Sequence, residues 1–140
     1  MGTVLTVTSG TIATLHREAA RAQPAEACGL LLGRAGEGSG AGEAIVAAIP
    51  CANVAPDPLR HFELDPAALI AAHRAARAGG PSVLGYWHSH PTGHPLPSAT
   101  DCEHAGGDGR VWAIVTENAI GWFRDTPEGF TVLPTRLVEG

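Results

Sequence analysis

The chain has no lysine. All nine of its basic residues are arginine, and 14 acidic residues bring the formal net charge to −5 at pH 7. Proteins that bind nucleic acids usually carry clustered basic residues and a high isoelectric point, so this composition argues against a nucleic-acid partner. The N-terminus is the only primary amine, so no side chain of this protein can form an isopeptide bond.

The sequence also lacks long apolar runs and closely spaced cysteines. No run approaches the ~18 apolar residues of a membrane-spanning helix, and residues 1–10 show no basic stretch followed by an apolar block, so we expect neither a membrane segment nor a secretory signal. The three cysteines, Cys28, Cys51 and Cys102, are odd in number and form no CxxC. They favour buried free thiols, Cys102 included, in a reducing compartment, and predict a cytoplasmic protein.

What is present predicts a folded domain. The 140 residues are 44% hydrophobic and only 16% charged, which excludes a disordered chain and favours one domain over residues 1–140. Alternating or short apolar runs predict strands at residues 3–8, 28–33, 44–49, 60–64, 83–90, 111–116, 119–124 and 130–133. Helical periodicity and capping residues predict helices at residues 11–22, 66–78 and 98–105, with Ser9 or Thr11 capping the first and Asp65 the second. A glycine-rich hairpin loop is expected at residues 35–42 and an irregular segment at residues 52–58. The fold class is therefore mixed α/β.

Two histidines close the predicted strand at residues 83–90. His88 and His90 are two positions apart, so both imidazoles face the same side, about 6.6 Å apart at Cα for a rise of ~3.3 Å per residue. A single strand histidine is more often a packed core residue than a ligand. Two on one face are harder to satisfy without an ion, and their ring nitrogens can converge on one metal.

A possible third ligand follows in the segment from Pro97 to Asp101. Ser98 suits the N-cap of a short helix and Asp101 falls three residues later, as in a capping box. Capping alone explains both residues, but a helix start also holds Asp101 rigidly and favours its ionised form. Two histidines and one carboxylate leave an open position, as in catalytic zinc sites. His94, in a loop, and His104, on the next helix, are interpreted as ordinary surface residues.

Such a site needs a group that accepts the proton of a metal-bound water. Glu26, immediately before the apolar run at residues 28–33, is the best candidate. A solvent-exposed loop carboxylate is the competing interpretation, and from the residues alone it is the stronger one. Sequence spacing cannot bring residue 26 to residue 88.

Taken together, Glu26-Ala27-Cys28-Gly29-Leu30, His88-Ser89-His90-Pro91 and Pro97-Ser98-Ala99-Thr100-Asp101 resemble the JAMM (MPN-plus) metallopeptidase family. The resemblance implies a mixed curved β-sheet flanked by helices, with a cytidine-deaminase-like architecture. It implies that His88, His90 and Asp101 bind Zn²⁺, that Glu26 activates the zinc-bound water that attacks the carbonyl, and that Ser98 hydrogen-bonds the oxyanion or the water.

Within that family the chain is similar to small single-domain bacterial members. These cleave the amide bond after the C-terminal Gly-Gly of ubiquitin-like sulfur-carrier proteins, which the resemblance implies as partner. The alternative is a non-catalytic MPN scaffold that binds proteins; the motifs of nucleobase deaminases and HExxH zincins are absent. An extended tail could add as a strand at residues 44–49 or 53–62. Candidates to line its groove are Asn53, Phe62, Tyr86 and Trp87, although core packing is the preferred interpretation for Phe62 and Trp87. The oligomeric state is left open.

Overall fold

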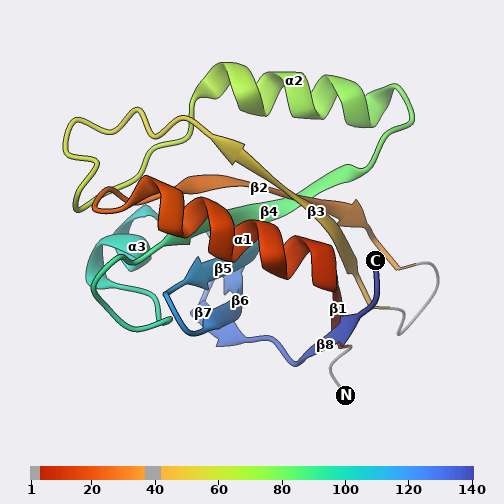
Figure 1. The fold of residues 1–140 in the computed structure, drawn as a ribbon. Coiled ribbons are helices and arrows are strands. Elements are labelled where there is room, and N and C mark those ends of the chain that lie inside the picture. Colours follow the sequence, from red (N-terminus) through yellow and green to blue (C-terminus); the bar gives the residue numbers. More distant parts are fainter. Residues whose placement is uncertain (1–3, 37–41) are drawn as a thin grey trace.

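The protein is built around one mixed β-sheet (Figure 1) in a computed structural model that describes residues 4–36 and 42–140. Its strands are β1 (Leu5–Thr8), β2 (Cys28–Arg34), β3 (Ala44–Cys51), β4 (Ser82–Ser89), β5 (Val111–Val115), β6 (Ile120–Thr126), β7 (Gly129–Val132) and β8 (Thr135–Val138). The helices are α1 (Ser9–Ala22), α2 (Pro66–Arg77) and α3 (Ala99–His104). The strands lie in the order β7-β6-β5-β4-β2-β3-β1-β8. The predicted α/β class is confirmed.

The sheet is strongly curled. β7 and β8 occupy its two ends, yet only Leu133 and Pro134 separate them along the chain. Leu133 donates its N–H to Trp122 in β6 at 2.9 Å, and the carbonyl of Pro134 accepts from Leu5 in β1 at 2.9 Å. An ion pair between Glu43, which directly precedes β3, and Arg124 in β6 also connects the two sides of the curled sheet. The curved sheet implied by the resemblance is therefore present.

Two apolar clusters stabilise the sheet. The larger joins α1, through Leu15, to buried side chains of β1, β2, β3, β4, β5 and β6, among them Trp87. The smaller contains Trp112, Ile114 and Phe123. α2 follows the segment that carries Phe62 along the chain. This helix packs mainly against β4 and lies along the top of the sheet in Figure 1. β4, which ends at the histidine pair, contributes to both clusters, because Trp87 belongs to the larger and Tyr86 packs against the smaller.

Capping residues explain where the helices begin. Asp65 caps α2 as predicted, accepting from the N–H of Ala67 at 3.0 Å. The cap predicted for α1 is wrong: Thr8 accepts from the N–H of Thr11, so the helix begins at Ser9, two residues earlier than expected. Ser98 caps α3 with the complete capping box, as the Ser-x-x-Asp spacing predicts.

Other predictions need correction. Residues 60–64 do not form a strand; only Leu64 makes a single bridge, to Asn53. β8 was not predicted, because Pro134 ends the preceding apolar run. Most of the loop expected at 35–42 and the first residue of the strand expected at 3–8 lie outside the described residues.

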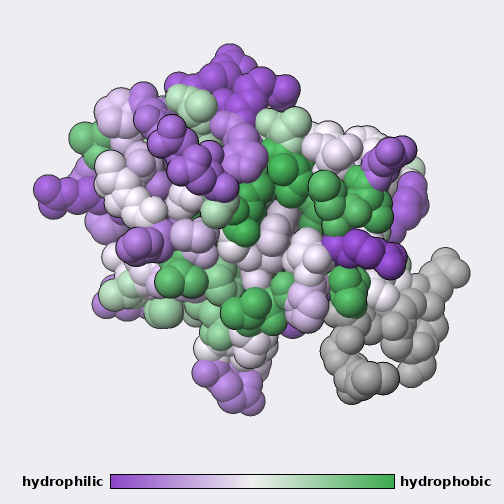
Figure 2. All heavy atoms as spheres, turned by 60° about the horizontal axis from the view of Figure 1, so that its bottom comes forward, coloured by the Kyte–Doolittle hydropathy of each residue, from purple (hydrophilic) through white to green (hydrophobic). Residues whose placement is uncertain are grey.

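The surface of the described residues mixes apolar and polar side chains. Figure 2 shows hydrophobic residues toward the middle of one face and hydrophilic ones mostly around it. Cys28 is buried, Cys51 is half-buried and Cys102 is exposed, and all three are free. The prediction of buried thiols is therefore wrong for Cys102, which the short helix α3 turns toward solvent. None of the described helices is both long and apolar enough to cross a membrane.

Candidate metal centre and active site

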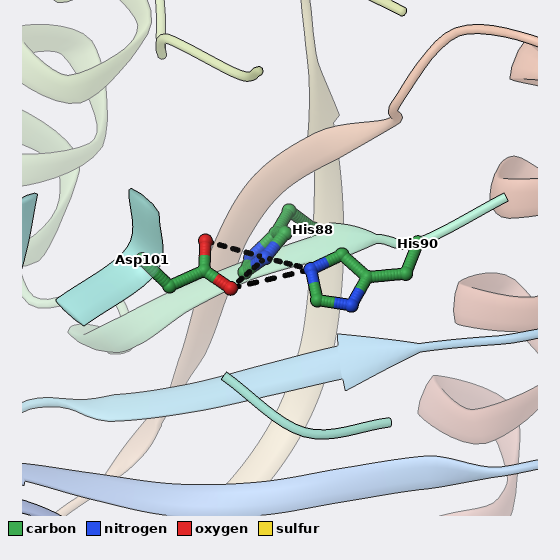
Figure 3. Close-up of side chains that lie close together, drawn as sticks. All are labelled: His88, His90 and Asp101. Atoms are coloured by element: carbon green, nitrogen blue, oxygen red, sulfur yellow. Dashed lines mark hydrogen bonds and ion pairs between the residues drawn. The ribbon is translucent and has the colours of Figure 1, made fainter. Parts of the chain in front are cut away.

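The end of β4 presents two imidazoles to one site. β4 ends at Ser89, so His88 is its penultimate residue and His90 follows it directly. The two rings point toward one another (Figure 3), and their Nε2 atoms lie 3.1 Å apart. His88 is fully buried, and Phe62 stacks on its ring with centroids 4.3 Å apart and planes at 15°. The paired geometry expected from strand alternation is thus realised.

Asp101 completes the group from α3. Its Oδ1 lies 3.1 Å from Nε2 of His88 and its Oδ2 lies 3.2 Å from Nε2 of His90. The capping box fixes the carboxylate, because the N–H of Ser98 donates to Oδ2 at 2.8 Å while the Ser98 hydroxyl accepts from the N–H of Asp101 at 3.1 Å. The serine thus uses an acceptor site on its hydroxyl and keeps the O–H proton free to donate elsewhere.

The three side chains fit one metal ion. Ligands 2.0–2.1 Å from a tetrahedral zinc ion lie about 3.3 Å from one another, close to the 3.1–3.2 Å between the donor atoms here. Nδ1 of His90 donates to the carbonyl of His94 at 3.0 Å, which orients the ring so that Nε2 faces His88 and Asp101. His88, His90 and Asp101 therefore form a metal-binding group with three protein ligands. His94 takes part through its backbone, which the sequence did not indicate.

The pKa directions in this group favour a neutral His88 and an ionised Asp101, while His90 holds its proton more tightly than a free imidazole. Burial lowers the pKa of His88, so this imidazole stays neutral. Burial alone would raise the pKa of Asp101, but the hydrogen bonds from both histidines and from Ser98 outweigh it and hold that pKa well below its usual value. For His90, burial is likewise outweighed by the Asp101 carboxylate, and its pKa is raised. A buried carboxylate facing two imidazole nitrogens attracts a metal ion.

Glu26 reaches this site through strand pairing. β2 and β4 run antiparallel, with Cys28 opposite His88. Residue 26, two positions before the start of β2, therefore lies on the side of the sheet where β4 ends. Glu26 is only 8% exposed and lines a 680 Å³ cavity together with His90 and Ser98. Burial, reinforced by Asp101 and opposed by His90, raises its pKa from 4.5 to about 7. The interpretation of Glu26 as a solvent-exposed loop carboxylate is therefore wrong.

Ser89 joins the end of β4 to the residues just before β2 through two hydrogen bonds. This serine lies between the two histidines and is 2% exposed. Its hydroxyl accepts from the N–H of Ala27 at 2.8 Å, and its own N–H donates to the carbonyl of Ala27 at 3.0 Å. This role of Ser89 was not predicted from the sequence, although a small hydroxyl residue between two histidines was the available signal.

The residues predicted to line a groove have separate positions. Asn53 and Trp87 line a second cavity, of 370 Å³, whose wall also includes Glu26. Trp87 is nevertheless fully buried, Phe62 packs on His88, and Tyr86 meets Trp112 edge to face. The predicted free edge at residues 44–49 is wrong at its start, because β3 is an interior strand and β1 pairs with its first two residues.

Comparisons with known proteins agree with this geometry. Residues 8–128 match the family described as prokaryotic homologs of the JAB domain. The chain is 40% identical over 91 residues to a desampylase of Haloferax volcanii, covering 65% of this chain and 62% of the relative. It is 36% identical over 104 residues to a probable TtuB-protein conjugate cleaving protease of Thermus thermophilus, covering 74% and 65%. The matches thus span less than two thirds of either relative.

Solved structures show the same fold. The solution structure of a protein from Desulfitobacterium hafniense superposes with a TM-score of 0.84 at 27% identity, covering 98% of this chain and 94% of that one. A solution structure from Salinibacter ruber gives 0.69 at 30% identity, covering 96% and 91%. The curled sheet with three helices is therefore a shared architecture.

Proposed function

We propose, from the premise that this chain belongs to the family of prokaryotic homologs of the JAB domain, that it is a zinc-dependent peptidase. Its substrate would be the amide bond after the C-terminal Gly-Gly of a ubiquitin-like sulfur-carrier protein. The observation that carries the proposal is the convergence of His88, His90 and Asp101 beside a cavity that also contains Glu26. We assign one domain, residues 1–140, to this activity.

Zinc is the metal that this donor set fits best for hydrolysis. Zinc accepts nitrogen and carboxylate oxygen, and its catalytic sites commonly have three protein ligands and one open position. When bound, it would act as a Lewis acid and lower the pKa of a coordinated water toward 7. The site would bind it with a neutral His88 and an ionised Asp101, the protonation states that the pKa directions favour.

Two further residues have roles in this proposal. Glu26, with a pKa raised to about 7, is suited to take a proton from water and pass it to the leaving amine, since a general base works best near the operating pH. Ser98 lines the same cavity, and its free O–H proton can stabilise negative charge that develops on the carbonyl oxygen.

The shape of the site and the names of the relatives support the proposed substrate class. Glu26 lines both the 680 Å³ cavity and the 370 Å³ cavity, so an extended tail without large side chains can pass the base and occupy both. A Gly-Gly terminus has this shape. The name of the Thermus relative describes a protease that cleaves protein conjugates. The three free cysteines favour a cytoplasmic location.

The test combines metal content with cleavage. Purified protein is analysed for bound zinc and incubated with a fusion of a sulfur-carrier domain, ending in Gly-Gly, to a reporter protein. Glu26→Gln preserves the shape of the side chain but cannot take up a proton. We expect it to keep zinc and to lose cleavage by about 10²–10⁴-fold, whereas Glu128→Gln, an exposed control in the β6–β7 turn, cleaves like the wild type.

The outcomes separate the enzyme from a binding module. Zinc-dependent cleavage after Gly-Gly that depends on Glu26 supports the proposal. A protein that binds the carrier domain without zinc and without cleaving the fusion would instead be a non-catalytic scaffold. Cleavage by Glu26→Gln at the wild-type rate would overturn the assignment of the base.

A further inference from the structure

Glu26 lies outside regular secondary structure, between α1 and β2, so other contacts must fix its position. Both of its backbone polar groups are bound by one segment, residues 53–64. Its N–H donates to the carbonyl of Pro58 at 2.8 Å, and its carbonyl accepts from Nδ2 of Asn53 at 3.0 Å. The candidate base is therefore docked on this segment through its main chain.

The amide of Asn53 makes four hydrogen bonds. Besides Glu26, its Nδ2 donates to the carbonyl of His61 at 2.9 Å. Its Oδ1 accepts from the N–H of Ala55 at 3.0 Å and from that of Glu63 at 3.1 Å. An asparagine side chain offers two donor hydrogens and two acceptor lone pairs, so every one of them is used. No other residue type of this size supplies both sets.

These bonds also shape the segment that meets the metal-binding group. Asn53 joins the start of the segment to residues 61 and 63, on either side of Phe62. Phe62 stacks on His88 with ring centroids 4.3 Å apart. One side-chain amide thus links the backbone of the base to the aromatic ring that covers a metal ligand.

We propose that Asn53 is a positioning residue for Glu26. Its amide closes residues 53–64 into one shape and anchors the main chain of Glu26 on it, which aims the carboxylate into the cavity shared with His90 and Ser98. The inference rests on the proposed function, because it assigns Asn53 to the base of that reaction. Asn53 touches no reacting atom and acts only through Glu26.

The variant Asn53→Asp tests the donor half of the amide. It keeps an oxygen acceptor for Ala55 and Glu63 but cannot donate to Glu26 or His61. A small displacement of a catalytic group can cost about 10²-fold in rate, so we expect kcat for the Gly-Gly fusion to fall by roughly ten- to a hundredfold, with KM changed less than about threefold and zinc retained. Asn118→Asp, the same change in the exposed β5–β6 turn, is the matched control and keeps the wild-type kcat.

A double-mutant comparison distinguishes positioning from a general structural role. Residues that act through one another are non-additive. In the Glu26→Gln background we therefore expect Asn53→Asp to leave the residual single-turnover rate unchanged. A further loss of the same factor as in the wild-type background would overturn the proposal, as would a wild-type kcat in the single Asn53→Asp variant.

Hydrogen exchange provides a readout that does not need activity. The amide proton of Glu26, bound to Pro58, is expected to exchange at least tenfold faster in Asn53→Asp and in Asn53→Ala than in the wild type. The amide of Ala113 in β5 serves as the internal reference and should be unchanged. Unchanged Glu26 exchange overturns the inference even if the protein proves inactive, whereas faster exchange in an inactive protein supports the anchoring and rejects only the proposed function. Loss of the fold in both variants would assign Asn53 to folding instead.

Discussion

The chemistry of Glu26 depends on where the fold holds it. A carboxyl group in solvent is ionised at neutral pH, but burial raises the pKa of Glu26 from 4.5 to about 7. A group with this pKa can both accept and return a proton near neutral pH. The same burial makes its ionised form costly in the metal-free protein.

This cost predicts a pH-dependent effect of Glu26→Gln on stability. The folded state holds the Glu26 proton more tightly than the unfolded state, so its contribution is complete below pH 4.5 and is lost as the pH rises through about 7. In the presence of a chelator, the variant should match the wild type at pH 4.5 and become more stable by up to about 3 kcal/mol above pH 7. Urea unfolding at both pH values measures the difference. A gap that does not change with pH would mean that Glu26 is not buried as described.

Among individual residues, the metal-binding side chains were easier to predict from the sequence than the hydrogen bonds of Asn53. A separation of two residues from His88 to His90 places both rings on one face, and a separation of three from Ser98 to Asp101 allows a capping box, so local geometry determined both pairs. The four bonds of Asn53 join residues up to 27 positions apart. No local pattern encodes such contacts.

At the scale of elements, β4, whose end presents the two histidines, lies between two close neighbours, β2 and β5. Gly85 pairs with Val111 of β5, and a Cβ at this position would collide with the carbonyl oxygen of Val111. Only glycine therefore allows β5 to approach β4 this closely. The close approach fixes the strand whose end holds the metal ligands.

Gly85→Ala should consequently destabilise the protein by about 1–3 kcal/mol, the usual cost of overpacking, and lower its melting temperature. Gly106→Ala is the matched control, since a Cβ there has no neighbour within 4 Å and Gly106 has no positive φ. Its melting temperature should be unchanged or slightly higher. Thermal unfolding of both variants decides the matter, and equal melting temperatures would contradict the tight packing of β4 on β5.

Element predictions succeeded where a periodic pattern and a cap agreed, as in α2. They failed at residues 60–64, where an apolar pattern suggested a strand. There the N–H groups of Arg60 and His61 donate to the carbonyl of Asp57, and that of Glu63 to the side chain of Asn53. A side-chain amide thus replaces the strand partner, which periodicity cannot reveal.

At the scale of the whole molecule, the sheet assembles a site from distant parts of the chain. The antiparallel pairing of β2 with β4 puts Cys28 opposite His88 and so brings Glu26 to the metal-binding group. α3 then adds Asp101 after a loop of several residues. Spacing alone could not place residue 26 beside residue 88; the resemblance of the motifs could, because it carries information about the fold.

The most direct test of this account is anomalous X-ray scattering at the zinc edge, from crystals grown with zinc. The account predicts one strong peak bounded by Nε2 of His88, Nε2 of His90 and the carboxylate of Asp101, each about 2.0–2.2 Å away. No peak among these three side chains, with zinc ordered elsewhere or nowhere, would contradict it.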